Sequence, residues 1–68
     1  MKSYTPKEII DLLTKRGFEF VRAKESHQVF VNRKTGLRTI VPMHSKDLKK
    51  GTLHGILKQA GIDPDDLK

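Results

Sequence analysis

One histidine in a strand-like segment is the residue of this chain best suited to transfer protons. His27 lies at the start of the apolar-rich stretch 26–31, SHQVFV. Histidine is the side chain that most readily gains and loses a proton near neutral pH. The surrounding segment is strongly basic, and basic surfaces attract phosphates. A proton-transfer group on a rigid strand beside a phosphate-binding surface is what metal-free cleavage of RNA requires.

Other catalytic and cofactor chemistries have weaker support in the residues. The chain contains no cysteine, and none of His27, His44 and His54 has a histidine four residues away, the spacing of a helical metal site. Gly51 and Gly55 stand in no phosphate-loop pattern. No pair of carboxylates is spaced for acid–base work. We therefore expect no metal and no other cofactor.

Positive charge is concentrated in the middle of the chain. Residues 15–58 contain eleven Lys and Arg against three acidic residues, a local net charge of +8, whereas the whole chain carries +6. Solvation alone explains some of this charge, but its density favours a polyanionic partner such as nucleic acid.

Size and composition indicate one small domain, residues 1–68. The first residues lack the apolar segment of a signal peptide, and no apolar stretch approaches the ~20 residues of a membrane span. With no cysteine in addition, we expect a cytoplasmic protein that does not contact membranes.

Helical periodicity marks both ends of the chain. A first helix over about 6–16 has Thr5 as N-cap, Glu8 completing a capping box, and Gly17 as its stop. A second helix is expected to start near 51–52, with Thr52 as a plausible cap, and to end at Gly61. Asp63 then caps a short terminal turn.

Three strands are expected between the helices. Alternation from residue 18 to 23 places Phe18, Phe20 and Arg22 on one face, and a second alternating run covers 27–32. A turn with Gly36 in the left-handed conformation leads to a third strand over 37–41, ended by Pro42. The predicted fold is α+β in the order α-β-β-β-α, a three-stranded antiparallel sheet with two helices packed on one face.

The pattern leaves open which sheet face carries the histidine. His27, Val29 and Val31 share one face, and Gln28, Phe30 and Asn32 share the other. If Phe30 points to the helices, His27 belongs to the open face; if the valines do, His27 starts the buried face. On residues alone the chain is predicted to be a module that binds RNA or DNA, with catalysis left open.

Two longer segments carry a resemblance to a known family. The stretch 41–53, VPMHSKDLKKGTL, and the stretch 56–62, ILKQAGI, resemble the C-terminal half of HicA-type toxins. Ser26-His27 followed by Phe30 is similar to the family's Gly-Ser-His-x-x-aromatic element, and the helical segment 9–18 fits the same template. The resemblance extends over residues 3–62.

The resemblance implies a fold like that of double-stranded-RNA-binding domains and a specific activity. HicA proteins are toxins of toxin–antitoxin pairs that cut mRNA without the ribosome, arrest translation and growth, and are neutralised by a HicB antitoxin. The catalytic histidine of the family corresponds to His27, which would act as general base on the ribose 2′-OH. Glu25 stands where the family usually has glycine, which puts a negative charge near the expected phosphate path.

Further site residues are expected around this histidine. Ser26 and His44 are auxiliary candidates, Ser26 for positioning and His44 as a proton donor, while His54 is expected at the surface. The candidates for holding RNA phosphates are Arg22, Lys24, Lys46, Lys49 and Lys50. Two non-catalytic alternatives remain: an RNA-binding module of similar fold, and an interaction protein whose basic face docks an acidic partner.

Overall fold

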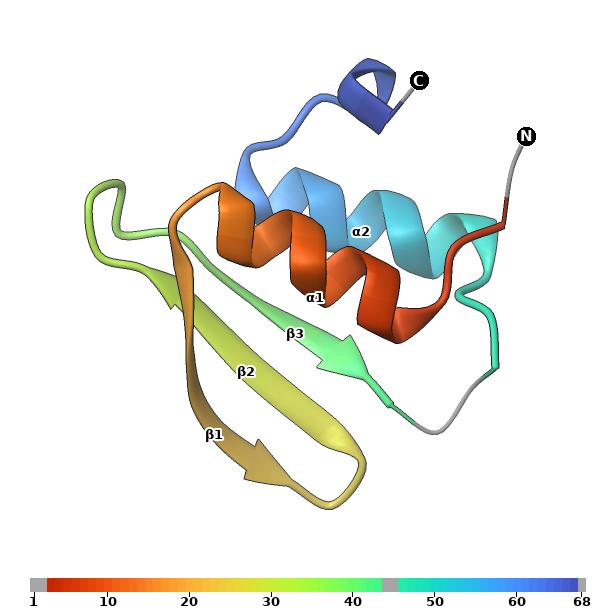
Figure 1. Ribbon diagram of the computed structural model, residues 1–68, viewed down its shortest axis with the longest axis horizontal. Helices are drawn as coiled ribbons and strands as arrows, with labels where there is room; N and C mark the ends of the chain where they lie inside the picture. Colours follow the sequence, from red (N-terminus) through yellow and green to blue (C-terminus); the bar gives the residue numbers. More distant parts are fainter. Residues whose placement is uncertain (1–2, 44–45, 68) are drawn as a thin grey trace.

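The computed structural model describes residues 3–43 and 46–67. The elements follow the order α1 (Pro6–Lys15), β1 (Phe18–Lys24), β2 (His27–Asn32), β3 (Arg38–Pro42) and α2 (Lys50–Ala60), with a terminal 3₁₀ turn, η1 (Pro64–Leu67). The three strands form one antiparallel sheet in the order β1-β2-β3. The α-β-β-β-α fold expected from the sequence is confirmed, as Figure 1 shows, and both helices contribute side chains to one core.

Helix α1 begins with the predicted capping box. The Glu8 backbone N–H donates to Thr5 Oγ1 at 3.2 Å, and the Thr5 N–H donates to Glu8 Oε1 at 2.9 Å. These bonds satisfy amides that have no partner inside the helix. The helix ends at Lys15, one residue earlier than expected, with Arg16 as C-cap and Gly17 at a φ of 93°.

Helix α2 begins earlier than predicted. Its N-cap is Lys49, whose extended backbone (φ −68°, ψ 151°) precedes the first helical residue, and no side chain caps it. Thr52 lies inside the helix, so its prediction as the cap was wrong. The helix ends at Gly61, as expected, and Gly61 has a left-handed conformation with a φ of 70°.

Strand β3 is displaced by one residue from its predicted range, starting at Arg38 and including Pro42. Pro42 pairs with His27 at the outer strand of the sheet. Since a proline has no N–H, it fits a strand position whose backbone points away from the neighbouring strand. The loop before β3 has Gly36 at a φ of 77°, which confirms the predicted left-handed turn residue.

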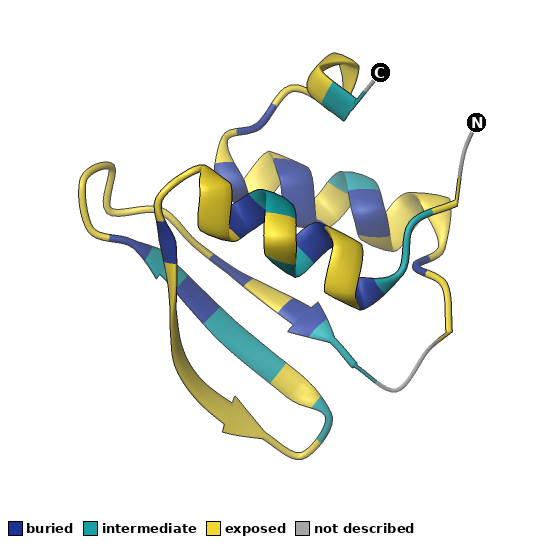
Figure 2. Cartoon of the chain, in the orientation of Figure 1, coloured by how far each residue is buried: buried dark blue, intermediate teal, exposed yellow. Residues whose placement is uncertain are grey.

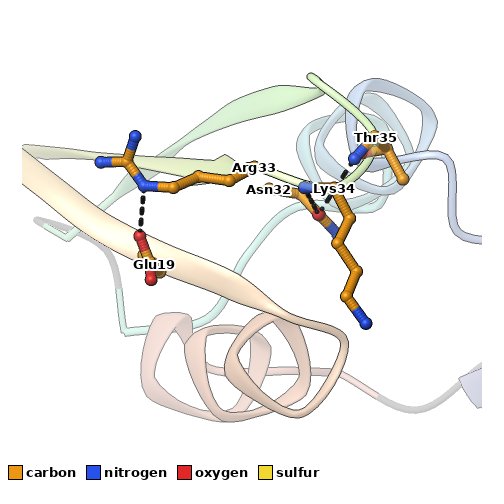
Figure 3. Close-up of polar contacts among 5 residues, drawn as sticks. All are labelled: Glu19, Asn32, Arg33, Lys34 and Thr35. Atoms are coloured by element: carbon orange, nitrogen blue, oxygen red, sulfur yellow. Dashed lines mark hydrogen bonds and ion pairs between the residues drawn. The ribbon is translucent and has the colours of Figure 1, made fainter.

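One buried amide side chain holds the β2–β3 loop against α1. Asn32 Nδ2 donates to the Arg16 carbonyl at 3.1 Å, and Asn32 Oδ1 accepts from the Lys34 and Thr35 N–H groups at 2.9 and 3.3 Å. Figure 3 shows Asn32 turned into the loop, with Arg33 reaching away toward Glu19 on β1. The fixed loop sets the register of β2 against β3.

The C-terminal turn is tied back onto the first elements. Asp63 Oδ1 accepts from the Asp65 N–H at 2.9 Å, which confirms Asp63 as the cap of the turn. The Tyr4 hydroxyl donates to the Leu67 carbonyl at 2.9 Å, and Arg16 pairs with Asp66 at 3.2 Å.

The core lies between the helices and one face of the sheet, and it leaves much of β1 outside. After Phe18, every residue of β1 is exposed, as the yellow strand in Figure 2 shows. Phe20 is 55% exposed although its ring packs edge-on against Phe30 at 5.8 Å. The buried apolar residues are Ile9, Leu13, Phe18, Phe30, Val41, Leu48, Leu53, Ile56, Leu57, Ala60 and Ile62. The β1–β2 hairpin therefore projects beyond the helical layer (Figure 1).

Candidate active site

His27 begins β2 directly after a two-residue turn. It pairs with Lys24 on β1 and with Pro42 on β3, so it stands in the central strand with neighbours on both sides. Paired residues of adjacent strands project to the same side of a sheet. The side chains of Lys24 and Pro42 therefore share a face with His27.

Burial decides which face this is. Phe30 is only 3% exposed and its partner Thr39 only 1%, and the Thr39 hydroxyl donates to the Ile56 carbonyl of α2. The face of Phe30 is thus the helix side. His27 alternates with it and lies, exposed, on the open face of the sheet. The sequence left the face of His27 undecided, and the structure places it on the open face, where a substrate can reach it.

A β-bulge brings a second cation to this face. The register shifts between Phe20, which pairs with Phe30, and Arg22, which pairs with Val29, so Val21 is an extra residue in β1. Simple alternation had put Arg22 on the face of Phe18 and Phe20, and that prediction was wrong because a bulge reverses the alternation beyond it. Arg22 and Lys24 both project from the face of His27.

These side chains surround a hollow on the open face. Its lining combines two cations, one carboxylate, the candidate base and two aliphatic side chains: Arg22, Lys24, Glu25, His27, Val29 and Ile40. Ile40 is 43% exposed, so its side chain is accessible at the surface of the hollow. Cations can hold phosphate oxygens, and exposed aliphatic groups can contact a ribose or a base. The two aliphatic residues were not predicted for the site; the exposed-face register was the signal that would have found them.

The turn before His27 has a backbone that favours glycine. Glu25 has a φ of 56°, the only positive φ of a non-glycine residue among those described. A positive φ at the first residue of a two-residue hairpin loop, and not at the second, is the pattern of a type II′ turn, in which glycine is preferred there. Glutamate in place of glycine at position 25 therefore strains the backbone of the turn, and it also places a carboxylate in the hollow.

The remaining predicted residues are placed less centrally. The Ser26 carbonyl accepts the Met43 N–H at 2.6 Å, which holds the turn to the end of β3. Lys46 and Lys50 are exposed and do not line the hollow, and Lys49 lines a separate groove beside α2 that His27 also borders. His44 lies outside the described residues.

His54 is not the surface residue that was expected. It is half-buried on α2, and its Nε2 is buried with no hydrogen-bond partner in the described part of the chain. Within residues 3–43 and 46–67, no group of three or more His, Asp, Glu or Cys could hold a metal ion. No helix among these residues is long and apolar enough to cross a membrane.

A comparison with protein families matches residues 6–62 to the family described as HicA toxin of bacterial toxin–antitoxin. The match includes both helices, the whole sheet and His27. The chain belongs to the HicA toxin family. It is accordingly a toxin of a toxin–antitoxin system, and its partner is an antitoxin. A comparison with curated proteins found no match to this chain.

The segment matched to the HicA family includes the hairpin whose side chains line the hollow on the open face. The match extends over the hairpin that joins β1 and β2, where Lys24, Glu25 and His27 lie within four consecutive positions. Lys24 and Glu25 line the hollow beside His27. This hairpin is the candidate active site.

Proposed function

We propose that this HicA toxin, as a single domain of residues 1–68, is an endoribonuclease that cuts mRNA without a metal or the ribosome. The observation that carries the proposal is the exposed His27 on the open sheet face with Arg22 and Lys24 beside it. Histidine supplies the proton transfer, and the two cations supply the charge that a phosphodiester attracts. Cleavage of mRNA arrests translation and growth.

The proposed reaction uses the RNA's own hydroxyl as nucleophile. His27 takes the proton of the ribose 2′-OH, and the 2′ oxygen attacks the adjacent phosphorus. The bond from phosphorus to the 5′ oxygen breaks, and that oxygen gains a proton as it leaves. His44 is the proposed donor of this proton. The products are a 2′,3′-cyclic phosphate and a free 5′-OH, so no water is consumed in this step.

Arg22 and Lys24 are proposed to hold the phosphate whose negative charge grows during the attack. Both cations project from β1 on the sheet face that carries His27, and one residue separates them in the strand. They can therefore reach neighbouring phosphate oxygens. Lys46, Lys49 and Lys50 are proposed to contact RNA farther along its path, where charge attracts the backbone without touching the reacting atoms. Ser26 is proposed to position His27 through the turn rather than to react.

The proposed partner is a HicB antitoxin that masks this face in the cytoplasm. The basic centre of the chain suits an acidic protein surface as well as RNA.

Analysis of the cleavage products tests the reaction. Purified toxin is incubated with a defined mRNA in EDTA, and the ends of the fragments are identified. We expect cyclic phosphate and 5′-OH ends at an undiminished rate. Ends bearing a 5′-phosphate, or loss of cleavage in EDTA, would contradict the proposed chemistry. RNA binding without any cleavage would favour the non-catalytic RNA-binding module.

A further inference from the structure

The outer edge of β3 has unpaired backbone groups. β3 is the end strand of the sheet, and only β2 pairs with it. The Asn32 N–H donates to the Leu37 carbonyl, and the Met43 N–H donates to the Ser26 carbonyl. These two bonds fix which alternate residues of β3 are hydrogen-bonded to β2.

Arg38 and Ile40 alternate with the residues of β3 that are hydrogen-bonded to β2. Their N–H and C=O groups therefore point outward from the edge, away from β2. Outside the β2–β3 ladder, none of the backbone hydrogen bonds in turns, loops and caps of residues 3–43 and 46–67 involves these two amides. Pro42 follows on the same alternation and offers only a carbonyl. The edge therefore presents two donors and three acceptors in the spacing of a strand ladder.

A groove runs beside this edge. One wall is β3, and the other is a stripe of α2 at helical spacing, Thr52, Gly55, Ile56 and Gln59. His27, Ile40, Pro42, Leu48 and Lys49 complete the lining. Its ionisable residues are His27 and Lys49, and none is acidic. An unpaired strand edge that faces a helix across a groove is a geometry that accepts an added peptide strand.

We propose that an extended, acidic segment of the antitoxin pairs with β3 as a fourth strand and fills this groove. The inference rests on the proposed function, because it assumes an antitoxin that neutralises the toxin at its active site. Charge selects this occupant. A second copy of the chain would bring the same net charge of +6 to the edge, whereas an acidic segment would be attracted to it.

The added strand would also reach the candidate base. Its residue opposite Pro42 lies two strands from His27 on the open face, a backbone separation of about 10 Å. An acidic side chain at this position can extend over Pro42 toward the imidazole. The same strand would thus bind by backbone hydrogen bonds and close the entrance to the hollow.

Two glycines of α2 provide a matched test. A Cβ added at Gly51 or Gly55 meets no atom within 4 Å, so both positions accept a larger side chain. Only Gly55 lines the groove. Gly55→Leu and Gly51→Leu are compared for growth arrest, with and without the co-expressed antitoxin, and for antitoxin affinity.

Leucine at Gly55 occupies the space needed by the strand, so we expect antitoxin affinity to fall by roughly 10- to 100-fold. Gly55→Leu should remain toxic and escape neutralisation, while Gly51→Leu should be neutralised like wild type. A Gly55→Leu toxin that is still neutralised with unchanged affinity overturns the edge proposal while leaving the proposed function intact. A wild-type toxin that neither cuts RNA nor arrests growth overturns the proposed function first.

Amide exchange in the complex tests the hydrogen bonds directly. In free toxin the Arg38 and Ile40 amides should exchange quickly, and in the saturated complex they should be protected. Fast exchange at both amides in the complex would overturn the proposal. Dimerisation of free toxin that Gly55→Leu abolishes would instead assign the edge to a second copy. Weakened RNA binding by Gly55→Leu with unchanged antitoxin affinity would assign it to RNA.

Discussion

Lys24 lies directly across the β1–β2 ladder from His27 and projects from the same sheet face. Directly paired side chains start about 4.5–5.5 Å apart at Cβ, so the ammonium can reach any anion that the imidazole contacts. The hairpin thus presents a base and a cation together, and the bulge at Val21 adds Arg22 to them.

The first prediction concerns these two cations. Lys24→Gln and Arg22→Gln should each reduce the slope of log affinity against log salt by about 0.7, the value for one phosphate contact with single-stranded RNA. The measurement is RNA binding across a salt series, made in a His27→Ala background so that the RNA stays intact. Lys7→Gln on α1 is the control, because Lys7 is exposed away from the sheet. If all variants show the same slope, Arg22 and Lys24 do not contact RNA phosphates.

A second prediction concerns the turn residue. Glu25→Gly should stabilise the protein by about 0.5–1 kcal/mol, because glycine relieves the left-handed strain but adds freedom to the unfolded chain. Glu25→Ala removes the same charge and retains a side chain at the positive φ, so it should gain none of this stability. Urea denaturation measures both. If alanine stabilises as much as glycine, the effect belongs to the charge and not to the backbone.

A third prediction concerns the anchor of the β2–β3 loop. Asn32→Ala removes three side-chain hydrogen bonds of a residue that is 7% exposed, and should destabilise the protein by about 2–3 kcal/mol. In a chain of this size that is a fall in Tm on the order of 10–20 °C. Lys34→Ala, at the same loop but exposed, should change Tm little. A small shift for Asn32→Ala would mean that the loop holds its register without these bonds.

The sequence predicted the elements and the order of the fold because their signals are local. The Thr5–Glu8 capping box and the stop at Gly17 each depend on residues a few positions apart, and both are present. The start of α2 was misjudged because Thr52 is a good cap by type, whereas the backbone turns into the helix at Lys49 with no side-chain cap.

The site was predictable only in part, because its geometry depends on pairing between strands. Residue types singled out His27, but the face it occupies follows from Phe30 packing under the helices. The bulge at Val21 cannot be recognised in a sequence that simply alternates. The face on which Arg22 lies is therefore known only from the pairing of β1 with β2. The sequence shows that Glu25 replaces the glycine usual in the family, and its positive φ explains why glycine is preferred at this position.

The central claim is that His27 performs the proton transfer of RNA cleavage, and the cleavage rate of His27→Ala tests it most directly. The variant should remain folded, because His27 is exposed, and should still bind antitoxin through the backbone of β3. We predict that its cleavage rate on a defined mRNA falls by roughly 10²–10⁴-fold, the range of general acid–base catalysis, with wild-type cleavage unaffected by EDTA. A folded His27→Ala protein that cuts RNA at the wild-type rate would contradict the account.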